Sequence, residues 1–169
     1  MTPKLKDFIK YNINDTVLFK HTLGDTITFR VISRINDYER LHYYQALPCG
    51  TPDKLVEYVK IVLRSDLRNL NLEFGTYCSS SHDCSFEYDF PNTMRAKINN
   101  IYFFYWIPYD FVSNISMTIN EVVYHGIYKS YGKICSGNSN SVKSELIFNS
   151  DNGVLKIQLD SNDYYEIIK

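Results

Sequence analysis

Two cysteines and a histidine form the closest group of residues that could do chemistry. Cys78 and Cys84 flank the polar segment SSSHD, which contains His82. Thiolate and imidazole groups bind zinc, but a zinc site needs a fourth ligand or an open water position, and no second cysteine pair follows at zinc spacing. A loop that contains a histidine incidentally is therefore favoured. Cys78 and Cys84 either form a disulfide or stay free thiols, because the cellular compartment decides oxidation.

The other polar residues predict neither a catalytic site nor a cofactor. His21, His42 and His125 are far apart in the sequence, and the chain has no phosphate-binding, dinucleotide-binding, nucleophile-elbow or zinc-protease motif. The segments Asn149–Asn152 and Asp160–Asp163 carry oxygen atoms of the kind that calcium binds. Asn and Asp are also common turn residues, because their side chains cap the local backbone. We therefore expect turns there, no metal, and no enzyme activity.

An aromatic segment is the best candidate for a binding surface. The run Ile101–Ile107 reads IYFFYWI, and Pro108 ends it. On a strand, alternate side chains lie on opposite faces, so one set can fill a core while the other meets a further layer, a ligand or a partner. Tyr and Trp suit interfaces because each combines a large apolar body with a polar tip. The predicted ligand-binding or partner-binding residues are Phe103, Tyr105, Trp106 and Tyr109, and the alternative is that the protein covers both faces itself.

Composition limits the fold class and the kinds of partner. The 169 residues fit one domain, 1–169, and include 15 Tyr and 10 Phe but only two alanines, which is typical of β-sheet rather than helix. With 18 basic and 19 acidic residues, the chain lacks the basic excess of a nucleic-acid binder. The chain has no run of eighteen apolar residues, so no transmembrane helix is expected.

Alternation of polar and apolar residues predicts about nine short strands. The clearest signal is Asn152-Gly153 between the apolar runs Glu145–Asn149 and Val154–Leu159, because this dipeptide tolerates the positive φ of tight hairpin turns. Leu23-Gly24-Asp25 is a second turn signal. The other runs that could supply these strands are Thr16–Thr22, Thr26–Arg34, His42–Leu47, Asn69–Phe74, Phe86–Phe90, Thr93–Asn99, Ile101–Ile107, Ile115–Tyr131 and Tyr164–Lys169. We expect an all-β antiparallel meander that forms a barrel or a sandwich.

Two segments are open to a helical interpretation. Thr51–Leu63 begins like a helix with Thr-Pro-Asp, yet its β-branched residues favour a strand. Lys4–Tyr11 is either a helical turn or an arm that docks on the domain. The fold is therefore expected to contain at most one short helix.

The two ends of the chain resemble a family. Small predicted lipoproteins of the Bacteroidetes cell envelope have similar ends. The similar segments are Tyr11–Arg34 (YNINDTVLFKHTLGDTITFRVISR) at the start, and Ile119–Ser130 (INEVVYHGIYKS) with Ser144–Lys169 (SELIFNSDNGVLKIQLDSNDYYEIIK) at the close. The resemblance implies an exported β domain that is tethered to a membrane by a lipid anchor. This sequence contains neither the family's leader nor its lipobox cysteine, and the resemblance identifies no catalytic residue.

These observations favour an exported, non-enzymatic domain of the bacterial cell envelope that binds a protein or ligand. One alternative is a barrel-type carrier of an apolar small molecule. Another is a cytoplasmic protein that neutralises a partner, as immunity proteins do.

Export and the Cys78–Cys84 pairing predict the result of an intact-mass measurement. After expression in an oxidising compartment, the protein should be lighter than its reduced form by two hydrogens per disulfide, and Cys78→Ser with Cys84→Ser should remove one such loss. Four free thiols after oxidising expression would count against both the disulfide and export.

Overall fold

The computed structural model describes most of the chain as strands and the turns between them. The described residues are 9–41, 54–65, 67, 69–79, 92–99, 101–107, 113–134 and 144–168. Within them, only the backbone is described for 39–41, 54–57, 76–79, 92–94, 104–107 and 133–134. No helix occurs in these segments, and none of them can supply a helix that is long and apolar enough to cross a membrane.

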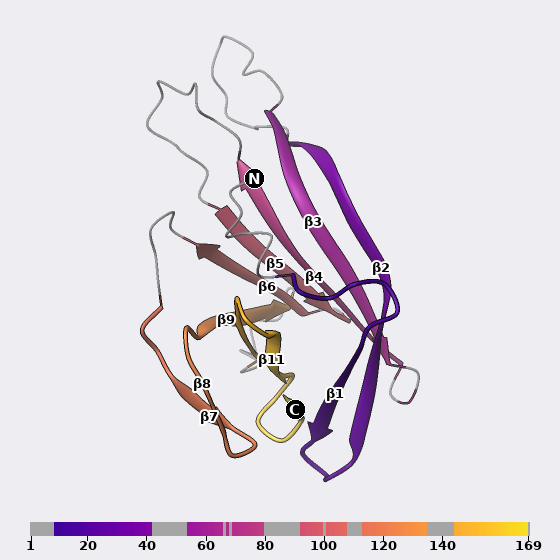
Figure 1. The fold of residues 1–169 in the computed structure, drawn as a ribbon, viewed down its shortest axis with the longest axis vertical. Helices are drawn as coiled ribbons and strands as arrows, with labels where there is room; N and C mark the ends of the chain where they lie inside the picture. Colours follow the sequence, from indigo (N-terminus) through magenta and orange to yellow (C-terminus); the bar gives the residue numbers. More distant parts are fainter. Residues whose placement is uncertain are drawn as a thin grey trace.

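Ten of the twelve described strands close into one antiparallel barrel. The strands are β1 (Thr16–His21), β2 (Thr26–Leu41), β3 (Lys54–Ser65), β4 (Leu70–Ser79), β5 (Asn92–Ile98), β6 (Ile101–Ile107), β7 (Met117–Ile119), β8 (Val122–Tyr124), β9 (Tyr128–Ile134), β10 (Glu145–Asn149), β11 (Gly153–Gln158) and β12 (Tyr164–Ile167). Their order around the barrel is β1-β12-β11-β10-β9-β6-β5-β4-β3-β2, and β7 and β8 form a separate hairpin between β6 and β9 (Figure 1). The predicted all-β antiparallel fold is confirmed, and it is a barrel.

One ambiguous segment is resolved as the strand that the sequence favoured, and two predicted strands differ from the described ones. The ambiguous segment 51–63 is strand from Lys54 onward, because β2 and β4 pair with β3 on both sides. The polar residues after Arg34, expected to end a strand, continue β2 to Leu41 for the same reason. The single strand predicted over Ile115–Tyr131 is wrong, because a turn at Asn120 and Glu121 divides it. The predicted strands His42–Leu47 and Phe86–Phe90 lie outside the described residues.

Opposite walls of the barrel meet through aromatic side chains. Phe74 on β4 and Phe148 on β10 are fully buried, and their ring centroids are 5.7 Å apart in an edge-to-face arrangement. β4 and β10 lie four places apart in a ring of ten strands, so this contact crosses the interior. A round barrel of ten strands would be wider, because barrel diameter grows with strand number. The wall is therefore flattened, and side chains fill the space between its two sides.

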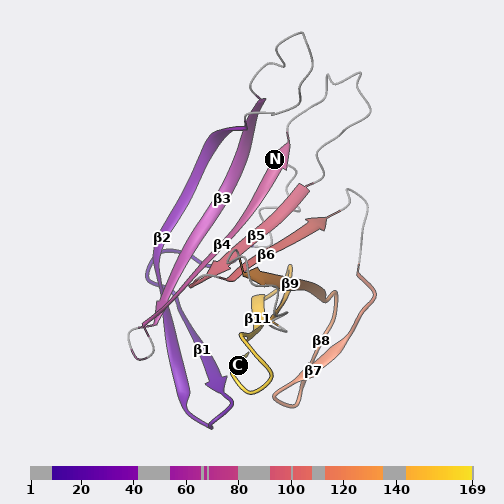
Figure 2. The same cartoon turned by 180° about the vertical axis from the view of Figure 1, so that it is seen from behind.

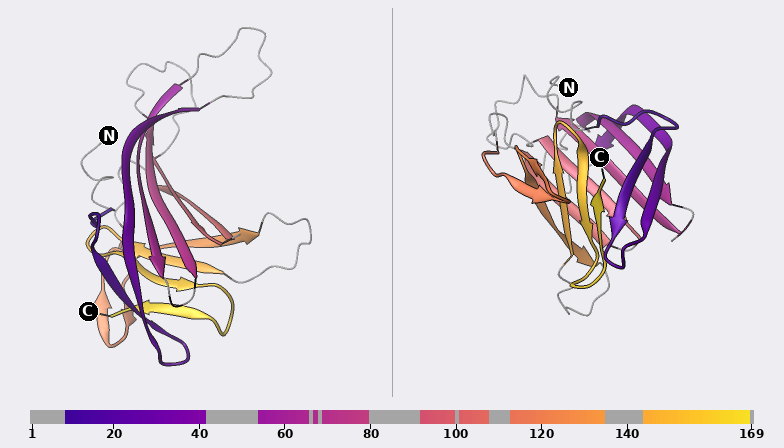
Figure 3. Two further views of the ribbon diagram at one scale, coloured as in Figure 1. Left: turned by 90° about the vertical axis from the view of Figure 1, so that its right-hand side faces the viewer. Right: turned by 60° about the horizontal axis from the view of Figure 1, so that its bottom comes forward.

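The barrel wall is closed over only part of its height. Pairing of β1 with β2 ends at Thr16↔Arg30, whereas pairing of β2 with β3 continues to Leu41↔Lys54. Pairing of β6 with β9 covers only three residue pairs, the last of them Phe103↔Gly132. The long strands β2–β5 consequently rise above the section that β9–β12 enclose, as the view from behind (Figure 2) and the side view (Figure 3) show. The bulge at Ile32 lies where β2 leaves the closed section.

The turn between β7 and β8 predicts a stabilising substitution. Asn120 and Glu121 have φ values of 46° and 65°, the combination that a type I′ hairpin turn requires. Glu121→Gly should raise the free energy of unfolding by about 0.5–1 kcal/mol. Positive φ strains a residue with a Cβ by about 1–2 kcal/mol, and the larger backbone entropy that glycine loses on folding offsets part of the relief. Urea unfolding measures the change. Thr118→Gly on β7 is the matched control and should lower stability, and a loss of stability in Glu121→Gly would contradict the turn assignment.

Candidate functional site

The predicted aromatic site divides between the core and residues that the structure does not describe. Phe103 is 1% exposed and lies in the core. The backbone of Tyr105 and Trp106 belongs to β6, where the register places Trp106 opposite Thr93 of β5. The side chains of Tyr105 and Trp106, and the whole of Tyr109, lie outside the described part of the chain. The binding role of these four residues stays a prediction.

The neighbouring Tyr102 is exposed, and it belongs to the part of this segment whose side chains the structure describes. Tyr102 is 44% exposed on the outer face of β6, and the ammonium group of Lys97 lies 5.2 Å from the centre of its ring. The predicted cysteine pair cannot be placed in the same way. Cys78 belongs to β4 through its backbone alone, and Cys84 lies outside the described residues.

The described polar clusters stabilise turns and strand closure. Asn149 Oδ1 accepts a hydrogen bond from the N–H of Asn152 at 2.8 Å, and Asp160 Oδ1 accepts from the N–H of Asp163 at 2.9 Å. The turns predicted there are confirmed. His21 is buried, its Nε2 lies 2.9 Å from Asp163 Oδ1, and its ring packs against Tyr165. Among the described residues, no three His, Cys, Asp or Glu side chains are grouped as a metal site requires.

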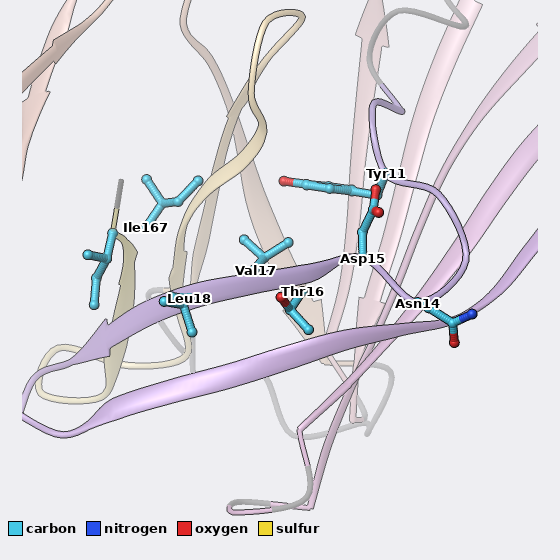
Figure 4. Close-up of a pocket in the computed structure, with 8 residues that line it drawn as sticks. Tyr11, Asn14, Asp15, Thr16, Val17, Leu18 and Ile167 are labelled. Carbon is cyan, nitrogen blue, oxygen red and sulfur yellow. The ribbon is translucent and has the colours of Figure 1, made fainter.

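A first hollow lies where the N-terminal arm, residues 9–15, joins the barrel. It has a volume of about 610 Å³ and is lined by Tyr11, Asp15, Leu18 and Ile167, among others (Figure 4). Val17 lies on the Tyr11 side of β1, and Leu18 lies on the opposite side (Figure 4). Asp15 Oδ2 accepts a hydrogen bond from the N–H of Asn12, so this carboxylate already serves the arm. We interpret the hollow as the junction between the arm and the barrel rather than as a binding site.

Tyr11 and Arg34 hold this arm against the interior. Ile9 is 2% exposed, and the Arg34 guanidinium donates hydrogen bonds to the carbonyls of Ile9 and Tyr11. The Tyr11 hydroxyl donates to the carbonyl of Asn152 at 2.7 Å and accepts from the N–H of Val154 at 3.0 Å. Gly153 makes room for the ring, because a Cβ there would lie 2.6 Å from the Tyr11 oxygen. The expected docking arm is confirmed for residues 9–11.

A second hollow, which we call the Gly75 groove, lies on the outer face of β3, β4, β5 and β6. Its volume is about 290 Å³, and its polar lining consists of Lys60, Glu73, Arg95, Lys97 and Tyr102 around Gly75. The register places Lys60 and Arg95 on either side of Gly75, and it places Lys97 between Glu73 and Tyr102. Lys60 Nζ lies 3.0 Å from Glu73 Oε2. Three cations and one carboxylate therefore surround a position that has no side chain.

The sequence analysis missed the residues of this groove. Lys60, Gly75 and Arg95 are separated by 15 and 20 positions, and no motif links them. The only signal was the alternation of β3, β4 and β5, which places the three residues on outward positions once the register is known.

Tyr11 predicts a loss of stability at high pH. Burial raises the pKa of Tyr11 above its ordinary value of 10.0, and the hydrogen bond from Val154 lowers it in part. The unfolded chain ionises near pH 10 while the folded protein keeps the proton, so this stabilisation is complete below pH 10 and decreases above it, by up to about 1.4 kcal/mol per pH unit. Urea unfolding of wild type between pH 8 and pH 12 (about two units on either side of the ordinary value) tests this.

Substitution of Tyr11 separates its contribution from that of the other tyrosines. Tyr11→Phe should lower the free energy of unfolding at neutral pH by about 1–3 kcal/mol, because the N–H of Val154 loses its buried acceptor, and it should flatten the alkaline slope. Tyr131→Phe, at an exposed position on β9, is the matched control and should leave stability at neutral pH unchanged. Equal alkaline slopes in wild type and Tyr11→Phe would contradict the assignment.

Comparison with known proteins leaves the family of this chain open. No protein-family model, curated protein or solved structure matches the sequence or the fold. The resemblance to envelope lipoproteins therefore stays a prediction, and function has to be inferred from geometry and chemistry.

Proposed function

We propose that this protein is a non-enzymatic binding domain of the bacterial cell envelope that binds its partner or ligand on the outside of the barrel. The observation that carries the proposal is the contact between Phe74 and Phe148 across the interior. Because side chains from opposite strands meet across the interior, there is no room for a ligand at the level of Phe74 and Phe148. We therefore propose that binding takes place on the outer surface, where the Gly75 groove lies.

The packing of the closed section supports this proposal beyond the single contact. Phe19 and Phe29 are fully buried with ring centroids 5.3 Å apart, and Tyr128 stacks on Phe148 at 5.5 Å. The arm adds Ile9 and Tyr11 to the same core. An apolar small molecule needs a pocket of roughly 300–1,000 Å³. In the described part of the closed section, side chains occupy the space that a carrier would leave empty, which favours outside binding over the carrier alternative.

The proposed location rests on the sequence. The ends of the chain resemble envelope lipoproteins, and an exported domain held near a membrane by a lipid anchor would present its outer face to soluble and membrane components alike.

Binding of uncharged apolar probes tests the proposal. Wild type should give no saturable fluorescence change with Nile red and no thermal stabilisation with benzene, because ligands stabilise only the state that binds them. Saturable binding of Nile red to wild type would favour the carrier alternative and overturn the proposal.

A cavity variant shows that the assay can detect a vacant interior. Phe74→Ala should lower the free energy of unfolding by about 3–5 kcal/mol, and benzene should recover part of this loss by occupying the cavity. Phe74→Leu provides a milder cavity if the alanine variant does not fold. Leu18→Ala, on the outer face of β1, is the matched control and should gain no response to benzene.

A further inference from the structure

We infer that the Gly75 groove binds an anionic, oxygen-bearing group, of which phosphate is the simplest example. This inference rests on the proposed function, since it names the chemistry of a ligand on the outside of the barrel. The groove combines cationic side chains, an exposed aromatic ring and a backbone position without a side chain.

The register determines the geometry of the groove. Lys60, Gly75 and Arg95 are consecutive partners across β3, β4 and β5. Because neighbouring strands lie about 4.8 Å apart, the two cationic residues start about 10 Å from each other on either side of the glycine. Long, flexible side chains at that separation can both reach a group that rests on Gly75. Tetrahedral and planar oxyanions accept several charge-assisted hydrogen bonds at once, and arginine and lysine are the usual donors.

Gly75 contributes no side chain to the floor of the groove. A Cβ at this position would point outward and would lie 3.0 Å from the carbonyl oxygen of Val59 and 3.4 Å from Lys60 Cβ. Any larger residue would therefore occupy the space between Lys60 and Arg95.

The second row of the groove extends the cationic surface toward an aromatic ring. Lys97 is the register partner of Glu73 on one side and of Tyr102 on the other. The carboxylate of Glu73 is close to Lys60 Nζ, which offsets its charge. With three cations and one carboxylate, the groove keeps a positive excess in a chain whose net charge is −1. Tyr102 offers a flat, half-exposed face for the organic part of a ligand.

Two sources of such a group are a soluble phosphate compound and the headgroup of an anionic lipid. Titration of the labelled full chain with inorganic phosphate, followed by amide NMR, tests the first source. Sedimentation with vesicles of anionic phospholipid, compared with vesicles of zwitterionic phospholipid alone, tests the second. We expect saturable shifts at the amides of Gly75 and Lys97 in phosphate, and binding that weakens as salt increases. Binding to anionic vesicles without shifts in phosphate would assign the groove to headgroups.

Variants relate the response to the groove. Lys97→Gln and Arg95→Gln should each weaken the response about tenfold, which corresponds to about 1.4 kcal/mol. Glu73→Gln should strengthen it severalfold, because it removes the one negative charge of the lining, and a merely structural role would not produce such a gain. Lys20→Gln, on the outer face of β1, is the matched control and should change neither response. Thermal unfolding establishes that each variant folds.

The inference is overturned if neither phosphate nor anionic vesicles bind, or if Lys20→Gln weakens binding as much as Lys97→Gln does. Neither result would contradict the proposed function, because the uncharged probes test the filled interior separately. Conversely, saturable Nile red binding would contradict the proposed function, whereas the response of the groove to phosphate would be unchanged.

Discussion

Contact between the two sides of the barrel governs the rest of the structure. Ten strands in a round barrel would enclose more space than side chains can fill, and an empty apolar interior would forfeit the packing that stabilises the fold. Here Phe74 and Phe148 meet across the interior, so the wall flattens and the aromatic side chains pack edge to face. The abundance of phenylalanine and tyrosine in this chain has a physical use, since large rings are needed to span the distance between opposite strands.

Two junctions between strands of the flattened wall, β6 with β9 and β1 with β12, depend on particular residues. Where β6 meets β9, a Cβ on Gly132 would lie 2.6 Å from Ile101 and 2.9 Å from the Phe103 ring, so only glycine fits without displacement of these side chains. Where β1 meets β12, three residue pairs close the ladder, and the contact of His21 with Asp163 reinforces the join. The N-terminal arm covers the interior where β2 departs from β1. Arg34 donates hydrogen bonds to two carbonyls of the arm, and the Tyr11 hydroxyl bonds the backbone of Asn152 and Val154. Closure therefore depends on a few specific contacts at these junctions.

Because the interior is filled with apolar side chains, the charged side chains available for binding lie on the outer face. Outward positions on β3, β4 and β5 carry lysine, arginine and glutamate, and these charged side chains are grouped around Gly75. Lys129 with Glu145 and Lys156 with Glu166 form partly buried ion pairs elsewhere on the outside. The Gly75 groove differs from these pairs because, among its described lining residues, cations outnumber the carboxylate around a position without a side chain.

The sequence by itself determined the strand content and the local turns, because alternation and residues that tolerate positive φ act over a few neighbours. The hairpin around Asn152-Gly153 and the strand Ile101–Ile107 follow from such local rules. The turn at Asn120 and Glu121 did not, since it contains no glycine although both residues have positive φ. Only the tertiary structure decided that the sheet closes, that Tyr11 is buried against Asn152 and Val154, and that Lys60 and Arg95 flank Gly75. Each of these depends on register between segments far apart in the chain, and register arises from the packing of the whole interior rather than from any short stretch of sequence.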